Sequence, residues 1–317
     1  MKIADIFPQR LIFWGKERMH VILVTGGTGL VGKHLVGALL KKGYTVRCLV
    51  RSPKKAGEVL PAGVELVRGD INDPESVKKA CQGVDKVIHL VAIIREHDEQ
   101  TFEHINVEGT LNLVIAAGQA GVKHFIHISA LGACDNSRYK YVYSKWRGEE
   151  AVRQSGLNWT ILRPSVIYGA GFNFFDRMIQ SLQMFPKPFV PVPGRGKTLF
   201  QPIAVEDVVR CILRVCENPG LTARVIEIGG PEHLSYSQML DRLLECLGEK
   251  RYKLYIPMPL MRLVVPLMGS ILRDPPVTPV ELKQMDLDNI TDIDAVENNF
   301  GFRPKALHNG LKYLAGR

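Results

Sequence analysis

Two side chains suited to proton transfer, Tyr141 and Lys145, stand four residues apart in a stretch with helical periodicity. Residues at this spacing share one face of a helix, so the ammonium group can lie near the phenol. A nearby cation favours the phenolate and lowers the pKa of the tyrosine, which suits general acid–base catalysis near neutral pH. Ser129 ends a predicted strand, where it can donate a hydrogen bond to a substrate carbonyl. We therefore predict Ser129, Tyr141 and Lys145 as the catalytic residues.

A glycine-rich loop near the start of the chain has the pattern of a phosphate-binding turn. It follows a short apolar run rich in β-branched residues (21–24) and precedes a helical pattern (30–40). Glycine lets the backbone turn sharply at Gly26, approach a pyrophosphate at Gly29 and pack the helix against the strand at Gly32. The N-terminus of the helix then faces the phosphates. Strand, tight turn and helix in this order predict a dinucleotide-binding site.

Strand and helix patterns alternate through the first half of the chain, which is typical of a parallel sheet with helices on both faces. Predicted strands cover 21–24, 45–50, 64–68, 86–92, 125–129 and 159–163, and predicted helices cover 30–40, 74–82, 107–120 and 141–154. Asp73 can cap the second of these helices, and Pro74 fits its first turn. The predicted fold class is α/β, a Rossmann-type doubly wound parallel sheet.

The pattern of residue types along the sequence changes after Gly169. Prolines across 185–194 exclude a regular helix there and predict loop and edge strand that bound a pocket. Helical patterns return over 205–216 and 236–247, with a strand over 225–228 between them. We divide the chain into an N-terminal extension (1–18), a Rossmann domain (19–170) and a smaller C-terminal substrate lobe (171–317), with 198–230 returning to the Rossmann domain.

Two apolar segments are too short or too interrupted to span a membrane. Prolines and arginines break the stretch 256–279, which we expect in the core of the C-terminal lobe; a membrane-facing or partner-facing patch is the alternative. The segment 1–18 also lacks the form of a secretory signal. We interpret it as an amphipathic segment on the protein's own surface, with an interfacial anchor or a partner helix as the alternative.

Composition excludes several classes of function. The chain has 317 residues, of which 46% are hydrophobic and 23% charged, as expected for a soluble protein with a substantial core. Its net charge of +9 is spread out, without basic runs interleaved with aromatics, which argues against nucleic acid and leaves an anionic ligand or membrane surface open. The six cysteines lack metal-ligand spacing. We expect reduced thiols, a cytoplasmic protein and no metal site.

The residues after the second predicted strand favour NADP(H) over NAD(H). An acidic residue there would bond the ribose hydroxyls of NAD, but the strand is followed by Arg51 and Ser52. Both can bind a 2′-phosphate, with Lys54 or Lys55 adding positive charge. The alternative is that these cations belong to a solvated loop and that NAD(H) binds.

Taken together, the motifs resemble the short-chain dehydrogenase/reductase superfamily, in the extended branch that includes nucleotide-sugar epimerases and dehydratases. The resemblance runs from Met19 almost to the C-terminus and implies that Asp70 lies near the adenine and that 163–169 passes the nicotinamide. At 89–92, His-Leu-Val-Ala replaces the more usual His-x-Ala-Ala, so cofactor packing is expected to differ there. The cofactor-binding residues we predict are Gly26, Thr28, Gly29, Leu30, Val31, Gly32, Arg51, Ser52, Asp70, Ile71, Leu90, Val91, Ala92, Asn106, Tyr141, Lys145, Pro164, Ser165 and Val166.

Within this superfamily, the segments 129–133, 159–165 and 284–289 are most similar to the group of the NAD(P)H-binding accessory subunit of respiratory complex I. Members of that group can hold a nucleotide as a structural element. Our leading hypothesis is an NADP-dependent oxidoreductase that moves a hydride between the nicotinamide and a carbonyl or alcohol. The alternatives are a non-catalytic NADPH-binding structural or assembly protein at a respiratory or membrane complex, and a nucleotide-sugar epimerase or dehydratase.

The partners implied are a small-molecule substrate and, by the resemblance, a second copy of the chain in a homodimer. Phe172, Phe174 and Phe175 follow the nicotinamide segment and could line an apolar substrate pocket, although ordinary packing within the lobe explains them equally well. Attachment to a membrane surface or a respiratory complex would make the protein peripheral to a membrane.

Overall fold

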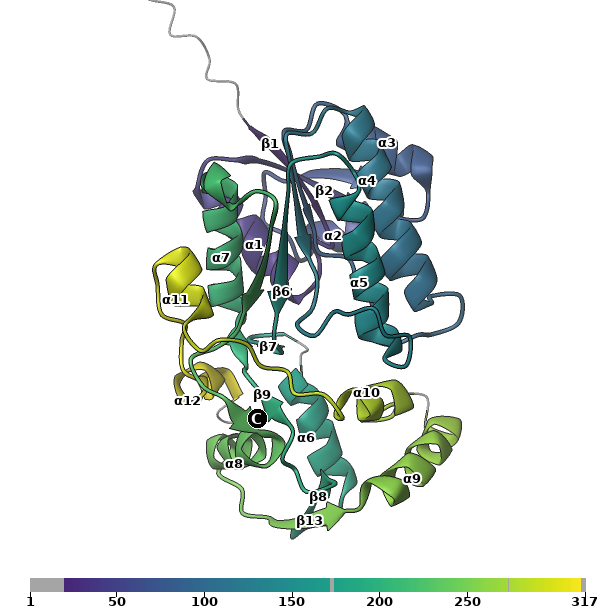
Figure 1. Cartoon of the computed structure of the whole chain (residues 1–317), viewed down its shortest axis with the longest axis vertical. Coiled ribbons are helices and arrows are strands. Elements are labelled where there is room, and N and C mark those ends of the chain that lie inside the picture. Colours follow the sequence, from purple (N-terminus) through teal and green to yellow (C-terminus); the bar gives the residue numbers. More distant parts are fainter. Residues whose placement is uncertain (1–19, 172–173, 273, 315–317) are drawn as a thin grey trace, which may run out of the picture.

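The computed structural model of the chain describes residues 20–171, 174–272 and 274–314, so the predictions for 1–18 and Phe172 lie outside the described residues. Its centre is a seven-stranded sheet in which every neighbouring pair of strands is parallel (Figure 1). In spatial order the strands are β11 (Arg224–Ile228), β6 (Trp159–Pro164), β5 (His124–Ile128), β4 (Lys86–His89), β1 (Val21–Thr25), β2 (Thr45–Val50) and β3 (Glu65–Arg68). The predicted Rossmann-type sheet is confirmed.

The strands are apolar on both faces because helices cover both faces of a parallel sheet. All five residues of β5 are buried, and Ile22, Leu23 and Val24 of β1 are fully buried. One face carries α1 (Leu30–Lys41), α7 (Val205–Glu217) and α11 (Ala295–Phe300), and the other carries α3 (Pro74–Cys81), α4 (Gly109–Gln119) and α5 (Lys140–Arg153). The core beneath α1 and α7 also includes Val296 and Phe300 of α11, which lie outside the returning segment 198–230.

Local signals explain most of these boundaries. Asp73 accepts a hydrogen bond from the backbone of Glu75 (3.2 Å) and Pro74 opens the first turn of α3, as predicted. The predicted helix over 107–120 differs at its start, because a π-helix (Glu103–Glu108) precedes α4. Strand β4 ends three residues earlier than predicted, since the chain leaves the sheet after His89. The short helix α2 (Pro53–Gly57) connects β2 to β3.

The smaller lobe lies beyond the carboxyl ends of the strands (Figure 1). Its elements are α6 (Phe174–Met184), β8 (Phe189–Pro193), β9 (Leu199–Phe200), β12 (Leu234–Ser235), α8 (Tyr236–Leu247), β13 (Tyr252–Ile256), α9 (Met258–Ile271), α10 (Pro279–Gln284) and α12 (Leu307–Gly310). The short strands β7 (Ile167–Tyr168) and β10 (Ile203–Ala204) pair in parallel where the chain crosses between the sheet and the lobe. Helix α8 has a complete capping box from Ser235 and Gln238 and ends at Gly248 in the left-handed region (φ 66°).

The expectation that the apolar stretch 256–279 forms core is wrong for most of α9. Of its apolar side chains only Met261 and Val265 are buried, packed beside Leu282 of α10. Helix α9 packs chiefly against α10, and its outer face is exposed among the described residues. No helix in the described part of the chain is long and apolar enough to cross a bilayer.

Candidate active site

Most of the predicted site residues follow the carboxyl ends of strands in the central sheet. These strand ends face the smaller lobe (Figure 1). The chain order reverses between β1 and β4, which are neighbours in the sheet. Ligands of open parallel sheets bind at such a switch point, in the crevice outside the carboxyl ends of the strands. The loops after β1, β4, β5 and β6 therefore form the framework of the site.

The glycine loop after β1 is shaped by close backbone contacts. Gly26 has a φ of 77°, a conformation that favours glycine, and a Cβ there would lie 3.1 Å from the backbone of Leu90 and Val91. A Cβ at Gly32 would lie 2.3 Å from the carbonyl oxygen of Gly26. Gly26 therefore lets the loop after β4 pack against the glycine loop, and Gly32 lets the first turn of α1 do the same.

Helix α1 presents an uncapped N-terminus at this loop. Gly29 is its N-cap residue and no side chain caps the helix, while Thr28 and Gly29 are exposed and Leu30 and Val31 are half-buried. The first turn of a helix carries unpaired N–H groups and the positive end of the helix dipole, which together bind anions. The geometry fits the pyrophosphate of a dinucleotide.

Polar side chains follow β2 and β3 on the far side of β1. Arg51 is exposed directly after β2. Ser52 caps α2 by accepting a hydrogen bond from the backbone of Lys55 (3.4 Å), which leaves its hydroxyl proton for another acceptor. After β3, the Asp70 carboxylate accepts from the backbone of Asn72 (3.0 Å), and Ile71 is buried. These residues can hold the adenosine half of a dinucleotide.

Lys145 and Ser129 meet at the end of β5. The Lys145 ammonium is buried and donates to the carbonyl oxygen of Ile128 (2.9 Å), the residue before Ser129. The Ser129 hydroxyl oxygen is buried and has no hydrogen-bond partner among the described residues. Buried polar groups are nearly always paired, so a hydroxyl left unpaired at a carboxyl strand end is suited to a ligand oxygen.

Tyr141 lies in the first turn of α5, one turn before Lys145. Its ring is half-buried against Phe102, with the ring centroids 6.0 Å apart. Burial raises the pKa of Tyr141 to about 12, whereas the sequence predicted a lowered pKa. The physical reason is desolvation of the phenolate by burial, and the Lys145 ammonium bonds the Ile128 carbonyl instead of the phenol. Tyr141 is a protonated acid at neutral pH in this geometry.

Asn106 fixes the backbone around Tyr141. Its amide oxygen accepts from the backbone of Ile93 (2.9 Å), and its amide nitrogen donates to the Ile93 carbonyl (3.1 Å) and to the Ser144 hydroxyl (2.9 Å). Ser144 in turn donates to the Tyr141 carbonyl (2.7 Å). Asn106 lies in the π-helix, a distortion often found at functional sites. It joins the loop after β4 to the turn of α5 that carries the tyrosine.

Comparisons with known proteins show the family of the chain. A family model described as NAD(P)H-binding matches residues 26–171. Sterol demethylase protein B of Methylococcus capsulatus is 31% identical over 284 residues, covering 80% of this chain and 81% of the relative. The chain belongs to the extended short-chain dehydrogenase/reductase group of NAD(P)H-binding proteins. The confirmed family supports a nucleotide at the switch point, while the roles of single site residues stay predictions.

Two further proteins are similar to this chain, one in sequence and one in fold. NADH dehydrogenase [ubiquinone] 1 alpha subcomplex subunit 9 of Dictyostelium discoideum is 32% identical over 247 residues, covering 75% of this chain and 66% of the subunit. The NADPH complex of the quinone oxidoreductase QOR2 from Escherichia coli superposes with a TM-score of 0.74 at 20% identity, covering 92% of this chain and 99% of that one. The second likeness concerns the fold.

Sequence reasoning missed Asn289, which holds the segment after β6. Its side-chain oxygen accepts from the Ser165 hydroxyl (2.6 Å) and from the backbone of Val166 (3.2 Å), and its amide nitrogen donates to the Leu131 carbonyl (3.3 Å). Leu131 also donates its N–H to the Pro164 carbonyl (2.9 Å). In the sequence, Asn289 stands out only as part of the resemblance at 284–289. No local pattern shows that its side chain reaches the site.

A buried ion cluster beneath Lys145 was also missed. The Glu149 carboxylate is fully buried and accepts two hydrogen bonds from Arg163 (both 2.8 Å) and one from Arg153 (2.6 Å). Arg163 continues to Glu227 of β11 (3.5 Å). One turn separates Glu149 from Lys145, so the cluster fixes the helix that carries the lysine. The sequence signal for this cluster is the carboxylate Glu149 on the inward face of α5.

Arg95 joins the loop after β4 to the lobe. Its guanidinium is almost fully buried and donates to both carboxylate oxygens of Glu281 (2.9 and 2.7 Å), to Asp274 (2.9 Å), and to the carbonyls of Pro275 (2.7 Å) and Pro276 (3.2 Å). Ile93, two residues before Arg95, is the residue held by Asn106. The loop is therefore clamped from both sides, by the tyrosine-bearing helix and by the lobe.

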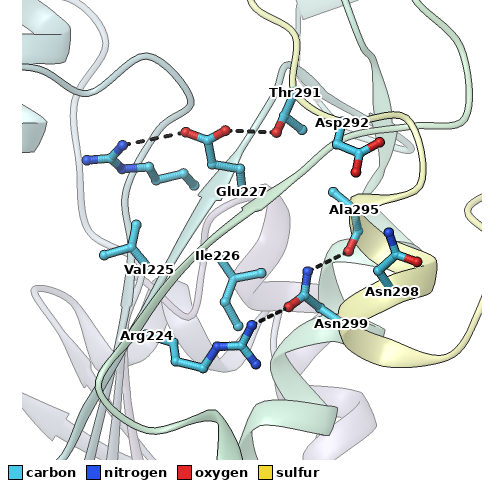
Figure 2. A pocket seen from close by; sticks show the side chains of 10 residues that line it. Arg224, Val225, Ile226, Glu227, Thr291, Asp292, Ala295, Asn298 and Asn299 are labelled. Carbon is cyan, nitrogen blue, oxygen red and sulfur yellow. Dashed lines mark hydrogen bonds and ion pairs between the residues drawn. The ribbon is translucent and has the colours of Figure 1, made fainter.

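A pocket of about 430 Å³ lies elsewhere, at the outer edge of the sheet along β11 (Figure 2). Arg224 donates to the side chain of Asn299 on α11 (2.7 Å), and Thr291 donates to Glu227 (2.8 Å). None of the predicted catalytic or cofactor residues lines it. The pocket is polar and its side chains already bond one another, so it is not the site of the predicted chemistry.

The buried His89 contacts residues of the sheet and of α4. His89 contacts the hydroxyls of Thr25 (2.7 Å) and Thr110 (3.0 Å) and stacks on His127 at 5.2 Å between ring centroids. Burial lowers the pKa of His89 to about 3, so the ring is neutral at physiological pH. Among the described residues no three His, Cys, Asp or Glu side chains are placed to hold a metal ion.

Proposed function

We propose that this protein is an NADP-dependent reductase of a carbonyl group on an apolar small molecule. In this reaction Ser129 donates a hydrogen bond to the carbonyl oxygen and Tyr141 delivers the proton that the oxygen needs as it becomes an alcohol. A bound nicotinamide supplies the hydride for the carbonyl carbon. Tyr141 is protonated at neutral pH, as the proton donor of a reduction must be.

The observation that carries the proposal is the unpaired hydroxyl of Ser129. It is buried directly after the Ile128 carbonyl that the Lys145 ammonium binds. The uncapped N-terminus of α1 lies at the same carboxyl edge of the sheet. Lys145 keeps positive charge next to the reacting oxygen and can bind a ribose hydroxyl of the cofactor.

The apolar character of the substrate rests on the lobe and on a relative. Phe175 is buried in the lobe core, edge-on to Tyr168 with ring centroids 6.0 Å apart, so it does not line a pocket as the sequence suggested. Phe174 is half-buried and packs against Phe200 (5.6 Å between ring centroids) in the lobe, and its place in a substrate pocket stays a prediction. The relative from Methylococcus capsulatus is named for a sterol, which supports an apolar substrate here.

The first test is the dissociation rate of NADPH, measured by chasing the bound nucleotide with an excess of unlabelled NADPH. A reductase must release its cofactor in every turnover, so we expect exchange within seconds. A substrate screen with apolar ketones and aldehydes then follows, monitored by loss of NADPH absorbance. Retention for hours would contradict the proposal.

Slow release would instead favour the second candidate, a protein that holds NADPH as part of a larger assembly. The observation behind it is the relative from Dictyostelium discoideum, which is named as a subunit of NADH dehydrogenase and is 32% identical. A nucleotide-sugar epimerase or dehydratase would also retain its cofactor. Addition of UDP-sugars distinguishes it, because only that enzyme would convert them.

Exchange of Arg51 for aspartate should weaken NADPH binding by roughly 10–100-fold, because a charge-assisted hydrogen bond to the 2′-phosphate is replaced by repulsion. NADH has no such phosphate, so its affinity should change little. Titration of both nucleotides by fluorescence measures the effect. Lys79→Asp on α3 is the control, since it makes the same charge change at an exposed site away from the cofactor. Equal losses for NADPH and NADH would remove the basis for NADP preference.

A further inference from the structure

Helix α9 carries an exposed apolar stripe that the proposed reaction does not use. The stripe consists of Leu260, Leu263, Val264, Leu267 and Ile271, with exposed fractions from 38% for Val264 to 82% for Ile271. At about 100° per residue these positions fall within roughly 100° of the helix circumference. Met261 and Val265 point the other way, into the contact with α10. The helix is therefore apolar on its inner and outer faces.

The stripe is held firmly on the body of the protein. Asp274, three residues after α9, and Glu281 of α10 both bind the buried Arg95. Arg262 of α9 also contacts Asp286 after α10 (3.1 Å). In Figure 1, α9 lies at the end of the molecule farthest from the amino end of the sheet, next to β8 and β13. It is an ordered surface feature at the outer end of the lobe.

Cations and tyrosines flank this apolar stripe. The sequence from Lys250 to Leu272 contains four basic residues and no acidic residue. Three of the four form ion pairs with acidic residues outside this segment, namely Arg251, Lys253 and Arg262. Lys250 precedes β13, and Arg195 occupies the turn after β8, where the neighbouring Gly194 donates to the carbonyl of Ile256 (2.8 Å) just before α9. Both cations are exposed, and no ion pair joins either to another described residue. Tyr252 and Tyr255 on β13 are 71% and 50% exposed.

We propose that α9 and β13 dock this protein on an anionic lipid surface. An apolar helix face flanked by cations and tyrosines matches the layers of a bilayer surface, with acyl chains below and negatively charged headgroups above. Fourteen residues give a helix of about 21 Å, which lies in the plane of the interface. Anionic headgroups would neutralise Lys250 and Arg195, for which the described residues provide no ion pair.

The test is flotation of the full chain with phosphatidylcholine vesicles, with and without phosphatidylglycerol. We expect binding to the anionic vesicles, weaker binding to the neutral ones, and a loss of about tenfold or more in the double variant Leu263→Glu/Leu267→Glu. The matched control is Leu111→Glu/Ile115→Glu on α4, which makes the same changes at the same spacing on another exposed helix face. The control should bind as the unchanged protein does.

Three outcomes would overturn the proposal. The first is equal vesicle binding by the α9 double variant and the unchanged protein, or no binding by the unchanged protein. The second is a lipid-free dimer that the α9 substitutions alone dissociate, which would make a second copy the occupant. The third is loss of binding on deletion of residues 1–18 while the α9 double variant still binds. Melting temperatures of all variants show whether each is folded, and none of these readouts depends on turnover.

Discussion

Replacement of Tyr141 by phenylalanine should lower kcat for carbonyl reduction by about 10²–10⁴-fold, the usual contribution of a positioned general acid. NADPH affinity should stay nearly unchanged, because the hydroxyl is the only group removed and the ring contact with Phe102 remains. Steady-state kinetics with the best carbonyl substrate and an NADPH titration measure the two effects separately.

The matched control is Tyr143→Phe, which removes a hydroxyl two residues away on the same helix. Tyr143 stacks on Trp146 with ring centroids 5.9 Å apart and belongs to no part of the proposed site. It should retain full activity and full NADPH affinity. Turnover by Tyr141→Phe within a few-fold of the unchanged protein would show that another group delivers the proton.

The position of Tyr141 depends on contacts that bring together three distant segments. Asn106 links Ile93 to Ser144, and Ser144 holds the Tyr141 carbonyl, so the loop after β4 sets the first turn of α5. Arg95, in the same loop, is anchored in the lobe through Glu281. A movement of the lobe over the substrate would therefore be transmitted to the tyrosine.

The sheet and the nucleotide edge could be predicted because their causes are local. Short β-branched runs between glycines and prolines mark the strands, and Gly32 is required by contacts with Gly26 and Gly27, a few residues away along the chain. Tyr141 and Lys145 share a helix, so their spacing alone places them together. Parallel strands then bring the loops after β1, β4 and β5 to one edge.

The remaining parts of the site could not be predicted because their causes are long-range. Asn289 reaches Leu131 across 158 positions, and Arg95 reaches Glu281 across 186. Which polar side chain completes such a contact depends on the path of the lobe, for which the sequence has no short-range signal. The exposure of α9 was mispredicted for a related reason. Apolar composition predicts burial, and only the tertiary structure shows that α10 covers one face.

The tyrosine pKa shows how chemistry can also depend on a partner outside the motif. Spacing correctly placed Lys145 on the helix of Tyr141, but the ammonium is bound to the Ile128 carbonyl. Burial then determines both pKa values, raising that of Tyr141 to about 12 and lowering that of Lys145 to about 8. Keeping Lys145 charged in this buried position therefore lowers the free energy of unfolding of the protein at neutral pH.

Substitution of Lys145 by methionine should abolish turnover and at the same time stabilise the fold at neutral pH. Burial lowers the pKa of Lys145 from 10.5 to about 8, although Glu149 acts in the opposite direction. Below pH 8 the folded protein must keep the buried ammonium charged, and this costs about 3 kcal/mol relative to the unfolded chain. Methionine has similar bulk and no charge, so this cost disappears in the variant.

The pH dependence separates this effect from ordinary packing changes. Between pH 8 and 10.5 the folded lysine loses its proton before the unfolded lysine does, so the unchanged protein gains stability as pH rises. The advantage of Lys145→Met should therefore be largest at pH 7 and shrink steadily toward pH 10.5. The variant also loses the hydrogen bond from Lys145 to the Ile128 carbonyl. Well below pH 8, where the ammonium is fully protonated, this loss changes the free energy of unfolding by an amount that does not depend on pH.

Urea unfolding at pH 7 and near pH 10 measures the difference, with Lys140→Met as the control. Lys140 is exposed at the start of the same helix, so its variant should follow the unchanged protein at both values. A Lys145→Met protein that is less stable at pH 7, or equally shifted at both pH values, would mean that the ammonium is not a net burden. That result would mean that Lys145 contributes to the stability of the fold. The expected result would instead leave catalysis and cofactor binding as the functions of Lys145.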